Sequence, residues 1–407
     1  MSRSSRYVPV VVVAVLGAGL VLVGPASAQS APVLRVGVAS AACPAPTQPT
    51  LVAAVAAAAP GSTILVCPGV YTGTVVVDKP LTLRGAQRGV DARAGRTNPA
   101  TESIIDGGGA AGIRITGTTS GVTVDGFTIR NAGNDTQTAD GIEAFGGGSG
   151  FTLTDNVITQ TTYGINMSSS GTSASTVAHN RFDSNNRSGA AGGSGVFVCC
   201  GPGNNLTIAD NLFSGHSAAA VNTAGDATRP STGLRIERNQ SVDDATFAVV
   251  VNATGAVLAD NVVVRRPGAT VDAGSGVYVG GGTTSLQVTR NVISAGAATG
   301  IRVTNMYGAP NVGLAVVGNQ VIGRLYGVRM SGQLSGIVRG NTIAGSTAVG
   351  ILLDADNAGV TVTGNRIGQD PLGCQDASTG TRTAHTANTW TGNVARRSTP
   401  VGICGRS

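Results

Sequence analysis

Apolar and polar residues alternate over short stretches of this chain, and the same stretch returns many times. Residues 275–293 show one complete unit. It opens with an apolar strand at Gly276-Val277, turns through glycines, and then places Leu286, Val288 and Ile293 among polar residues. Alternation with a period of two, rich in β-branched residues and without a helical stripe, predicts short strands that each bury one face.

An asparagine marks each unit, in most cases two residues before an apolar side chain. The asparagines are Asn156, Asn180, Asn211, Asn239, Asn261, Asn291, Asn319, Asn341, Asn365 and Asn393. Their spacings lie between 22 and 31 residues, and strand repeats of this length indicate a solenoid. We therefore expect an all-β fold, a parallel β-helix of about a dozen coils in which each strand stacks on its counterpart one unit later.

Each asparagine is expected to lie at a corner of the coil. Asparagine tolerates the left-handed backbone conformation, and Gly126 would meet the same need in the first unit. Stacked asparagines can also hydrogen-bond to one another along the axis. The repeat therefore predicts a ladder of side-chain amides, to which Asn291 belongs.

The N-terminus carries a different pattern. Residues 1–28 combine Arg3 and Arg6 with a long apolar run and a small-residue cleavage site, which is typical of a secretory signal peptide. The alternative is an uncleaved signal anchor. With the signal removed, we expect a secreted protein with no membrane span.

The body of the chain divides into three further parts. Residues 29–60 would form a leader and an N-terminal capping helix, because Leu51–Ala59 follows a good N-cap residue and stops at Pro-Gly. Such a helix would cover the open end of the coil, where unpaired strand edges invite aggregation. The parallel β-helix would then occupy residues 61–368, and residues 369–407 would form a C-terminal cap with the last partial coil.

Three motifs near the start of the repeats carry a resemblance. They are Pro60-Gly-Ser-Thr-Ile64, Pro68-Gly-Val-Tyr71 and Asp78-Lys-Pro-Leu-Thr-Leu-Arg-Gly85. Together with the capping helix, they resemble the first coils of right-handed parallel β-helix proteins of the pectate-lyase-like superfamily. The closest group is the secreted β-helix-repeat proteins that also resemble the periplasmic maturation protein of nitrous oxide reductase. The likeness covers about residues 48–395 and implies the fold, but folds of this kind host unrelated activities.

The net charge and the composition limit the classes of partner that this chain could bind. The formal net charge is +6 and falls to +4 when the two arginines of the signal are removed, so acidic partners are favoured in general. The sequence has no Lys/Arg run interleaved with aromatic residues, which is the pattern that would indicate nucleic-acid binding. Aromatic residues make up 3% of the chain and 61 residues are glycine, which suits a narrow coil with many corners. We expect a monomer.

Six cysteines in a secreted chain should be oxidised. A bridge from Cys43 to Cys67 would join the N-terminal cap to the coil, and a bridge from Cys374 to Cys404 would hold the other end. The adjacent Cys199 and Cys200 could bond to each other, with strain in the peptide between them, or remain separate thiols. Zinc is not expected, because no second cysteine pair or histidine has ligand spacing.

Outward residues of the first strand in each unit should form a stripe, one residue after each buried Val or Ile. This gives Glu143, Asn166, Phe197, Asn222, Val250, Tyr278, Arg302, Arg329 and Leu352. In pectate-lyase-like enzymes the corresponding face holds the oligosaccharide. Tyr278 could stack on a sugar ring, and Arg302 and Arg329 could bind uronate carboxylates. Asn166 and Asn222 would add polar contacts to this substrate-binding set, and the alternative is an ordinary solvated stripe.

Two further candidates involve titratable side chains. Asp135, Asp140 and Glu143 lie within nine residues and could hold Ca²⁺ with a uronate, since a hard cation prefers several oxygens. They could equally be solvated turn residues, so no cofactor is certain and Ca²⁺ stays a hypothesis. His216 could act as a general acid or base, or play a structural part.

Catalysis is not supported by the sequence. The motifs of polygalacturonase-like hydrolases and of alginate epimerases, which the resemblance would lead one to look for, are missing. The acidic residues near the first coils and Arg302 are some five coils apart, roughly 25 Å, which is too far for one site. We therefore expect a protein that binds an extracellular, acidic polysaccharide or a surface partner along its strand face. A lyase or hydrolase with a diverged site and a passive structural protein are the alternatives.

Overall fold

The computed structural model describes residues 32–134, 138–188, 192–266, 274–294, 296, 298–306 and 309–405. The signal peptide predicted at 1–28 lies outside the described residues, as does Asp135 of the calcium hypothesis. Within these ranges, no helix is long and apolar enough to cross a membrane. The described chain from residue 32 onward forms one compact unit.

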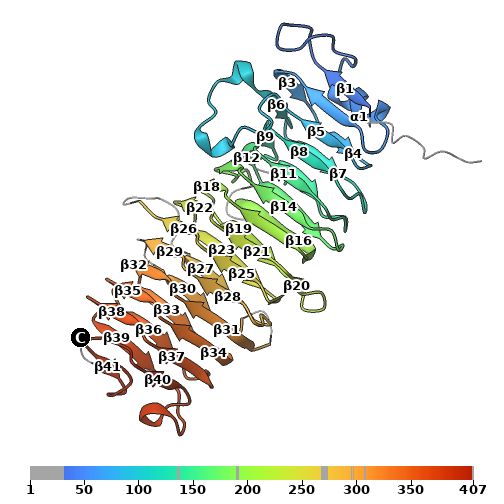
Figure 1. Cartoon of the computed structure of the whole chain (residues 1–407). Coiled ribbons are helices and arrows are strands. Elements are labelled where there is room, and N and C mark those ends of the chain that lie inside the picture. Colours follow the sequence, from blue (N-terminus) through green and yellow to red (C-terminus); the bar gives the residue numbers. More distant parts are fainter. Residues whose placement is uncertain are drawn as a thin grey trace, which may run out of the picture. The chain divides into compact units, whose positions relative to one another are not determined.

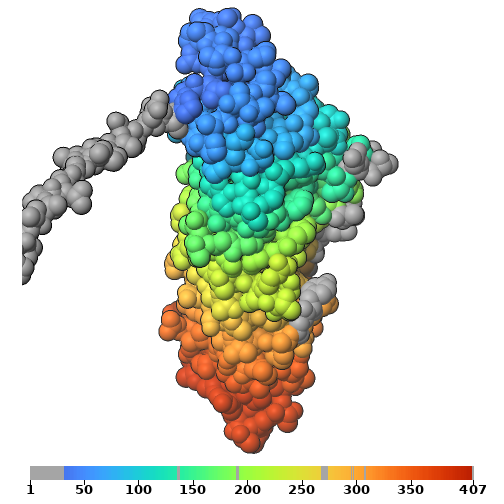
Figure 2. All heavy atoms as spheres, turned by 90° about the vertical axis from the view of Figure 1, so that its right-hand side faces the viewer, coloured from blue at the N-terminus to red at the C-terminus, as the bar shows by residue number. Residues whose placement is uncertain are grey.

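Three long parallel sheets run along this unit, with 14, 13 and 12 strands, so the solenoid has about 13 turns (Figure 1). Every strand pairs with its counterpart one coil earlier and one coil later. In Figure 2 the colours accordingly follow one another in bands from residue 32 to residue 405. The all-β parallel β-helix expected from the repeat is confirmed.

Sheet 1 is the 14-stranded sheet. Its outward positions carry a run of threonines in register on consecutive coils, from Thr63 to Thr207, as expected for side chains that favour strands. Its strands are β1 (Val33–Val36), β2 (Thr63–Val66), β5 (Thr82–Arg84), β8 (Thr123–Asp125), β11 (Thr152–Thr154), β14 (Ser175–Ala178), β17 (Leu206–Ala209), β21 (Arg235–Glu237), β25 (Val257–Ala259), β28 (Gln287–Thr289), β31 (Asn311–Val317), β34 (Gln333–Arg339), β37 (Val360–Thr363) and β40 (Thr389–Thr391).

Sheet 2, with 13 strands, carries the stripe singled out in the sequence. Its strands are β4 (Val75–Val77), β7 (Ile113–Ile115), β10 (Ile142–Ala144), β13 (Tyr163–Ser169), β16 (Ser194–Gly203), β19 (Ala219–Ala224), β23 (Thr246–Val251), β27 (Val277–Val279), β30 (Ile301–Val303), β33 (Tyr326–Met330), β36 (Val349–Leu353), β39 (Leu372–Asp376) and β41 (Ser398–Thr399). A glycine precedes the first buried residue in most of these strands. At Gly164 a side chain would lie 2.5 Å from the carbonyl oxygen of Gly195 on the next coil, so only glycine fits.

Sheet 3 has 12 strands. They are β3 (Gly69–Thr72), β6 (Ser103–Asp106), β9 (Phe127–Ala132), β12 (Val157–Thr161), β15 (Arg181–Asp183), β18 (Leu212–Ser214), β22 (Gln240–Val242), β26 (Val262–Val264), β29 (Val292–Ser294), β32 (Gln320–Ile322), β35 (Thr342–Ala344) and β38 (Arg366–Gly368). A short pair, β20 (Ser231–Thr232) and β24 (Ala253–Thr254), lies outside the three sheets. The inward residues of all three sheets form one continuous core, in which Phe182 and Phe213 stack with ring centroids 4.8 Å apart.

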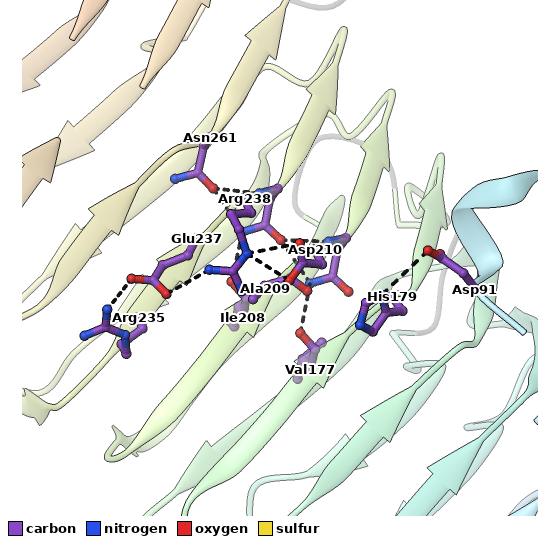
Figure 3. Close-up of polar contacts among 12 residues, drawn as sticks. Asp91, Val177, His179, Ile208, Ala209, Asp210, Arg235, Glu237, Arg238 and Asn261 are labelled. Atoms are coloured by element: carbon purple, nitrogen blue, oxygen red, sulfur yellow. Dashed lines mark hydrogen bonds and ion pairs between the residues drawn. The ribbon is translucent and has the colours of Figure 1, made fainter. Parts of the chain in front are cut away.

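The asparagine ladder is present and buried, with every member from Asn156 to Asn393 at most 2% exposed. Asn291 is representative: its backbone N–H and its Nδ2 both donate to Oδ1 of Asn319, each over 2.9 Å, and Nδ2 also donates to the carbonyl of Leu258. Oδ1 of Asn291 accepts in the same way from the N–H and Nδ2 of Asn261. Figure 3 shows the middle of this ladder, where the amides also donate to the carbonyls of Ile208 and Val177.

The prediction that each asparagine itself takes the left-handed backbone conformation is wrong by one residue. The left-handed conformation belongs to the residue before each asparagine, for example Asp155, Asp210 and Arg290, with φ near +55°. Gly126, with φ of +79°, lies in this column, and Phe127 is the residue in register with the ladder, since its N–H donates to Oδ1 of Asn156. The corner thus needs a left-handed residue, and the asparagine after it supplies the amide.

The left-handed column also carries charge along the middle coils. Arg238 binds Asp210 on the preceding coil over 2.8 Å, and Arg290 binds Asp260 over 2.7 Å. Figure 3 shows Arg238 lying between Asp210 and Glu237, and His179 reaching Asp91. These are exposed surface pairs, so they contribute little to stability.

Further elements lie at both ends of the coil. Helix α1 (Leu51–Ala57) begins at Thr50, whose side chain accepts from the N–H of Ala53, and it ends two residues before the predicted Ala59. The leader contributes more than expected, because β1 precedes the helix and extends sheet 1. At the other end β39 to β41 continue the sheets into the predicted cap, and a 3₁₀ turn, η4 (Thr383–His385), lies between them.

The polar loop before β6 is ordered. It contains two 3₁₀ turns, η1 (Ala92–Ala94) and η2 (Pro99–Thr101). Arg96, between these two turns, donates to buried Glu102 over 2.7 Å and to the carbonyl of Phe127 over 3.0 Å. The loop therefore covers the first corners of the coil.

The bridges Cys43–Cys67 and Cys374–Cys404 are both formed, as predicted. We expect that replacing Cys374 and Cys404 together by alanine will lower the free energy of unfolding by about 3 kcal/mol, because a closed loop of this length restricts the unfolded chain. Chemical denaturation of the non-reduced proteins measures this difference. Equal stability of the parent and the double variant would contradict a stabilising role for the C-terminal bridge.

Candidate functional site

The outward stripe of sheet 2 exists and its register is continuous. Glu143 pairs with Asn166, Phe197 with Asn222, and Tyr278, Arg302 and Arg329 follow on consecutive strands. One member was assigned wrongly: Val249 lies between Asn222 and Tyr278, whereas Val250 is fully buried. The unit at β23 starts with Ala248, so counting from Val249 shifted the position by one.

The C-terminal half of the stripe holds an arginine–tyrosine cluster, formed by Tyr278, Arg302, Tyr326 and Arg329. The guanidinium carbon of Arg302 lies 5.6 Å from the ring centroid of Tyr278, and that of Arg329 lies 5.2 Å from the ring centroid of Tyr326. Each cation lies over an aromatic face, an arrangement that favours this position of the side chain, and both arginines are half-buried.

The two arginines of this cluster differ in their partners. Nε of Arg329 donates to Asp354 over 3.0 Å, so its charge is already balanced. Among the described residues, no carboxylate forms an ion pair with Arg302. Arg302 is therefore the stronger candidate for binding an anionic ligand, and Arg329 would have to share its charge with Asp354.

An acidic cluster occupies the N-terminal half of the stripe and comprises Asp140, Glu143, Arg114 and Asn166. Asp140 is 3% exposed and accepts from Nδ2 of Asn166 over 2.9 Å and from the N–H of Tyr163 over 3.3 Å. Burial raises the pKa of Asp140 to about 7, and the charge of Glu143 adds to this effect. Asp140 can therefore exchange a proton near neutral pH.

Glu143 has a different environment from Asp140. It forms an ion pair with Arg114, one coil earlier, and both residues line a shallow pocket of about 360 Å³ together with Phe145. Two carboxyl groups on one face, one holding its proton and one paired with a cation, could serve acid–base chemistry. The acidic cluster lies six strands from Arg302, roughly 29 Å away, so the two clusters are separate.

The calcium hypothesis gains no support from Asp140 and Glu143. Their oxygens are engaged by Asn166, Tyr163 and Arg114, and the described residues contain no group of three His, Cys, Asp or Glu side chains placed to hold a metal. Asn166 is also less available than its outward position suggested, because it is 8% exposed and its Oδ1 lies 3.5 Å from Sγ of Cys199. Asn222 remains half-buried on the stripe between the two clusters.

The buried Asp140 has a consequence for stability. Because its pKa in the folded state lies above that of an unfolded aspartate, near 3.9, folding is favoured below pH 4 and this contribution is lost as the pH rises to about 7. We expect Asp140→Asn to gain stability relative to the parent by about 4 kcal/mol between pH 4 and pH 8, since a pKa difference of about three units corresponds to about 1.4 kcal/mol for each unit. Denaturant unfolding at both values measures the gain. A constant difference between the two proteins would show that Asp140 does not titrate there.

The adjacent cysteines lie beside the acidic cluster on a bulge of β16. The strand register shifts between Met167 and Ser169, so extra residues of β16 bulge from the sheet. Cys199 and Cys200 are not bonded, although their sulfur atoms are 2.6 Å apart, and Cys200 has φ of +64°. Burial raises the pKa of the Cys199 thiol to about 12, so Cys199 is not an activated nucleophile.

His216 is structural. It is fully buried and lies in a second polar column, five residues after the asparagine ladder. Nδ2 of Asn185 donates to its Nε2 over 3.1 Å, and its Nδ1 donates to Asp244 over 2.6 Å. This arrangement requires neutral imidazole with the proton on Nδ1. No surface is within its reach, so it takes no part in a site.

Several contacts of both clusters were missed in the sequence. Tyr326 and Asp354 complete the surroundings of Arg329. Tyr163 packs against Phe197 with ring centroids 4.6 Å apart and ring planes tilted by 36°. Tyr163 and Tyr326 each occur two residues before the buried residue of a strand. That shared position is the signal by which they could have been found.

Two family profiles match parts of the chain. The profile described as "Right handed beta helix region" matches residues 79–241, and the one described as "Periplasmic copper-binding protein (NosD)" matches residues 236–405. No curated protein matches the sequence.

Several solved structures resemble this chain, and the first one named here does so with a TM-score above 0.5. The catalytic unit of a GH87 α-1,3-glucanase from Streptomyces thermodiastaticus superposes with a TM-score of 0.59 at 16% identity, over 84% of this chain and 64% of that one. This chain therefore spans less than two thirds of the glucanase unit. The mannuronan C-5 epimerase A-module from Azotobacter vinelandii gives 0.48 at 15% identity, over 86% and 93%. The DFA-IIIase from Arthrobacter chlorophenolicus gives 0.47 at 16%, over 75% and 84%.

The description of the second profile mentions copper, but the described residues of this chain do not offer a set of copper ligands. Copper favours imidazole, thiolate and thioether ligands. Within the described part of 236–405 the one histidine is His385, Cys374 and Cys404 are bonded to each other, and Met330 is fully buried. The remaining thioether, Met306, is exposed and accepts from the hydroxyl of Tyr278. These residues do not fit a copper site.

Proposed function

We propose that this chain, a right-handed parallel β-helix protein, is secreted and binds an acidic polysaccharide along sheet 2. The glucanase that shares the fold acts on a polysaccharide, but at 16% identity the likeness extends to the fold alone. The residues of the strand face must therefore carry the proposal.

The observation that carries it is the arginine–tyrosine cluster. Tyr278, Arg302 and Arg329 occupy consecutive coils in one register, so their spacing is roughly 5 Å, close to the rise of one sugar residue in an extended chain. Tyr278 offers an aromatic ring on which a sugar can stack. The guanidinium of Arg302, which lies over that ring, offers a positive charge for a carboxylate. A polyuronate could lie along the axis with its carboxylates on successive coils.

Binding by this cluster should be weak and sensitive to salt. A charge-assisted pair on a half-exposed face contributes about 0.5–1 kcal/mol, and salt screens it. We expect polygalacturonate to slow the protein in affinity electrophoresis at low ionic strength, with or without calcium. Changing Arg302 and Arg329 together to glutamine should weaken the interaction about tenfold, since two such pairs are lost.

A matched control removes the same charge elsewhere. Arg339 on sheet 1 and Arg366 on sheet 3 are both exposed, and their double change to glutamine should leave binding intact. Equal loss in both double variants would indicate attraction by net charge. If the parent does not bind polyuronate at low salt, the stripe is an ordinary solvated surface and the proposal fails.

A second candidate function is glycan cleavage at the acidic cluster. It is favoured by one observation, the buried Asp140 whose pKa is raised to about 7 close to Glu143, which is paired with Arg114. Asp140 would donate a proton to the leaving oxygen, and Glu143 would stabilise the opposite charge or activate water. Release of reducing ends from a panel of neutral and acidic polysaccharides, lost in Asp140→Asn, would support it. Absence of any release by the parent would exclude it for those substrates.

A further inference from the structure

Two neighbouring cysteines, Cys199 and Cys200, bulge together from sheet 2 beside the acidic cluster. Strand β16 pairs with β13 on both sides of them, at Val198 and at Gly203. Between these points Cys200 takes the left-handed conformation, with φ of +64°, which is uncommon for a residue other than glycine. The sheet therefore fixes the backbone before and after the pair, and the bulge sets how its two side chains meet.

The bulge brings the two sulfur atoms of the pair together. They lie 2.6 Å apart, closer than sulfur atoms in ordinary non-bonded contact, and a disulfide bond measures about 2.05 Å. Cys200 is exposed and Cys199 is half-buried, so a reagent in solution reaches the pair at Cys200. The other four cysteines are taken up by the terminal bridges Cys43–Cys67 and Cys374–Cys404. The pair is thus a dithiol whose sulfur atoms need only a small movement to bond.

We propose that Cys199 and Cys200 form a reversible redox site, at which the two thiols close to a disulfide between neighbouring residues. The exposed Cys200 thiolate attacks a disulfide-containing oxidant, and a mixed disulfide forms as one thiolate of the oxidant leaves. Cys199 then attacks the sulfur of Cys200, and the second thiol of the oxidant departs with the Cys199 proton. In total, two electrons and two protons pass from the cysteines to the oxidant, which ends as two thiols.

This bond differs from the terminal bridges in how readily it opens. The Cα atoms of neighbouring residues are about 3.8 Å apart, whereas disulfides usually join Cα atoms about 4.4–6.8 Å apart. The terminal bridges, with Cα distances of 5.5 and 6.3 Å, lie within that range. Because strained and exposed disulfides are the more easily reduced ones, a mild thiol reductant should open the bond between Cys199 and Cys200 first.

Oxidation at this site also reaches the acidic cluster. The Cys199 thiol donates to Oδ1 of Asn166 over 3.5 Å, and Nδ2 of the same amide donates to Asp140 over 2.9 Å. A disulfide has no S–H group, so closing the ring removes the first of these hydrogen bonds. The redox site itself does not depend on the proposed polysaccharide function, because both reacting groups belong to the chain.

Peptide mapping of the full-length protein tests the site. Cleavage by trypsin after Arg187 and Arg235 releases both cysteines in one peptide that contains no other cysteine. After equilibration with oxidised glutathione, we expect this peptide to be lighter by two hydrogen atoms and to resist alkylation. Reduced glutathione should restore both alkylated thiols at a concentration about tenfold below the one that opens the terminal bridges.

Two single variants distinguish the ring from other oxidation products. Cys199→Ser keeps the exposed thiol alone and should carry glutathione after the same treatment. Cys200→Ser keeps the half-buried thiol, and its peptide should not lose hydrogen. In the parent, a peptide that keeps two alkylatable thiols, that carries glutathione on Cys200 or that links two chains would overturn the proposal. A bond that opens only together with the terminal bridges would also contradict it.

Discussion

Replacing Asp244 with leucine should be among the most damaging single changes in this protein, with a loss of about 3–5 kcal/mol of unfolding free energy. Its carboxylate accepts from Nδ1 of His216 over 2.6 Å, from the N–H of His216 over 2.8 Å and from the hydroxyl of Ser241 over 2.6 Å. Both side chains of the His216–Asp244 pair are inaccessible to solvent. Leucine would leave three donors without an acceptor in the interior of the coil.

Asp244→Asn is the matched control. The amide oxygen of the new asparagine can still accept from the backbone N–H and from Nδ1 of His216. The asparagine oxygens of the neighbouring ladder accept from two donors in the same way, so a loss of about 1 kcal/mol or less is expected. Denaturant unfolding of the three proteins at neutral pH measures the differences. A leucine variant as stable as the asparagine variant would mean that these hydrogen bonds contribute nothing.

The second large effect is expected at the asparagine ladder. Asn291→Leu removes the acceptor of two donors on Asn261 and the donor to the carbonyl of Leu258. Since each orphaned buried group costs about 1–3 kcal/mol, the loss should be about 3–5 kcal/mol. Gln287→Leu, an exposed position on the same coil, should change stability by less than about 0.5 kcal/mol. Identical melting curves for both variants would refute the ladder as a source of stability.

The repeat, the caps and the terminal bridges could be predicted because they depend on local patterns. Alternating residues such as Leu286 and Val288 define a strand, and Thr50 defines a helix start, without reference to distant residues. The same regularity brought Tyr278, Arg302 and Arg329 into one register. The misassignment of Val250 arose because Ala248 stands where most units have Val or Ile, so Val249 was counted as the buried residue. The offset at Gly126 arose because the left-handed residue precedes the asparagine in every unit.

Asp140 and Glu143 could be singled out in the sequence, but their contacts could not be predicted, because these depend on which coil lies next to which. Asp140 meets Asn166 across 26 residues, and Glu143 meets Arg114 across 29 residues. Insertions such as the bulge at Cys199 change the number of residues between equivalent positions on neighbouring coils. No motif spacing in one coil reveals burial of a charge by the next.

A crystal structure of the protein with a bound uronate oligosaccharide tests the central claim most directly. The proposal predicts sugar density along β27, β30 and β33, with a carboxylate within hydrogen-bond distance of Arg302 and a ring stacked on Tyr278. Density over Asp140 and Glu143 instead, or crystals that take up no oligosaccharide at low salt, would contradict it.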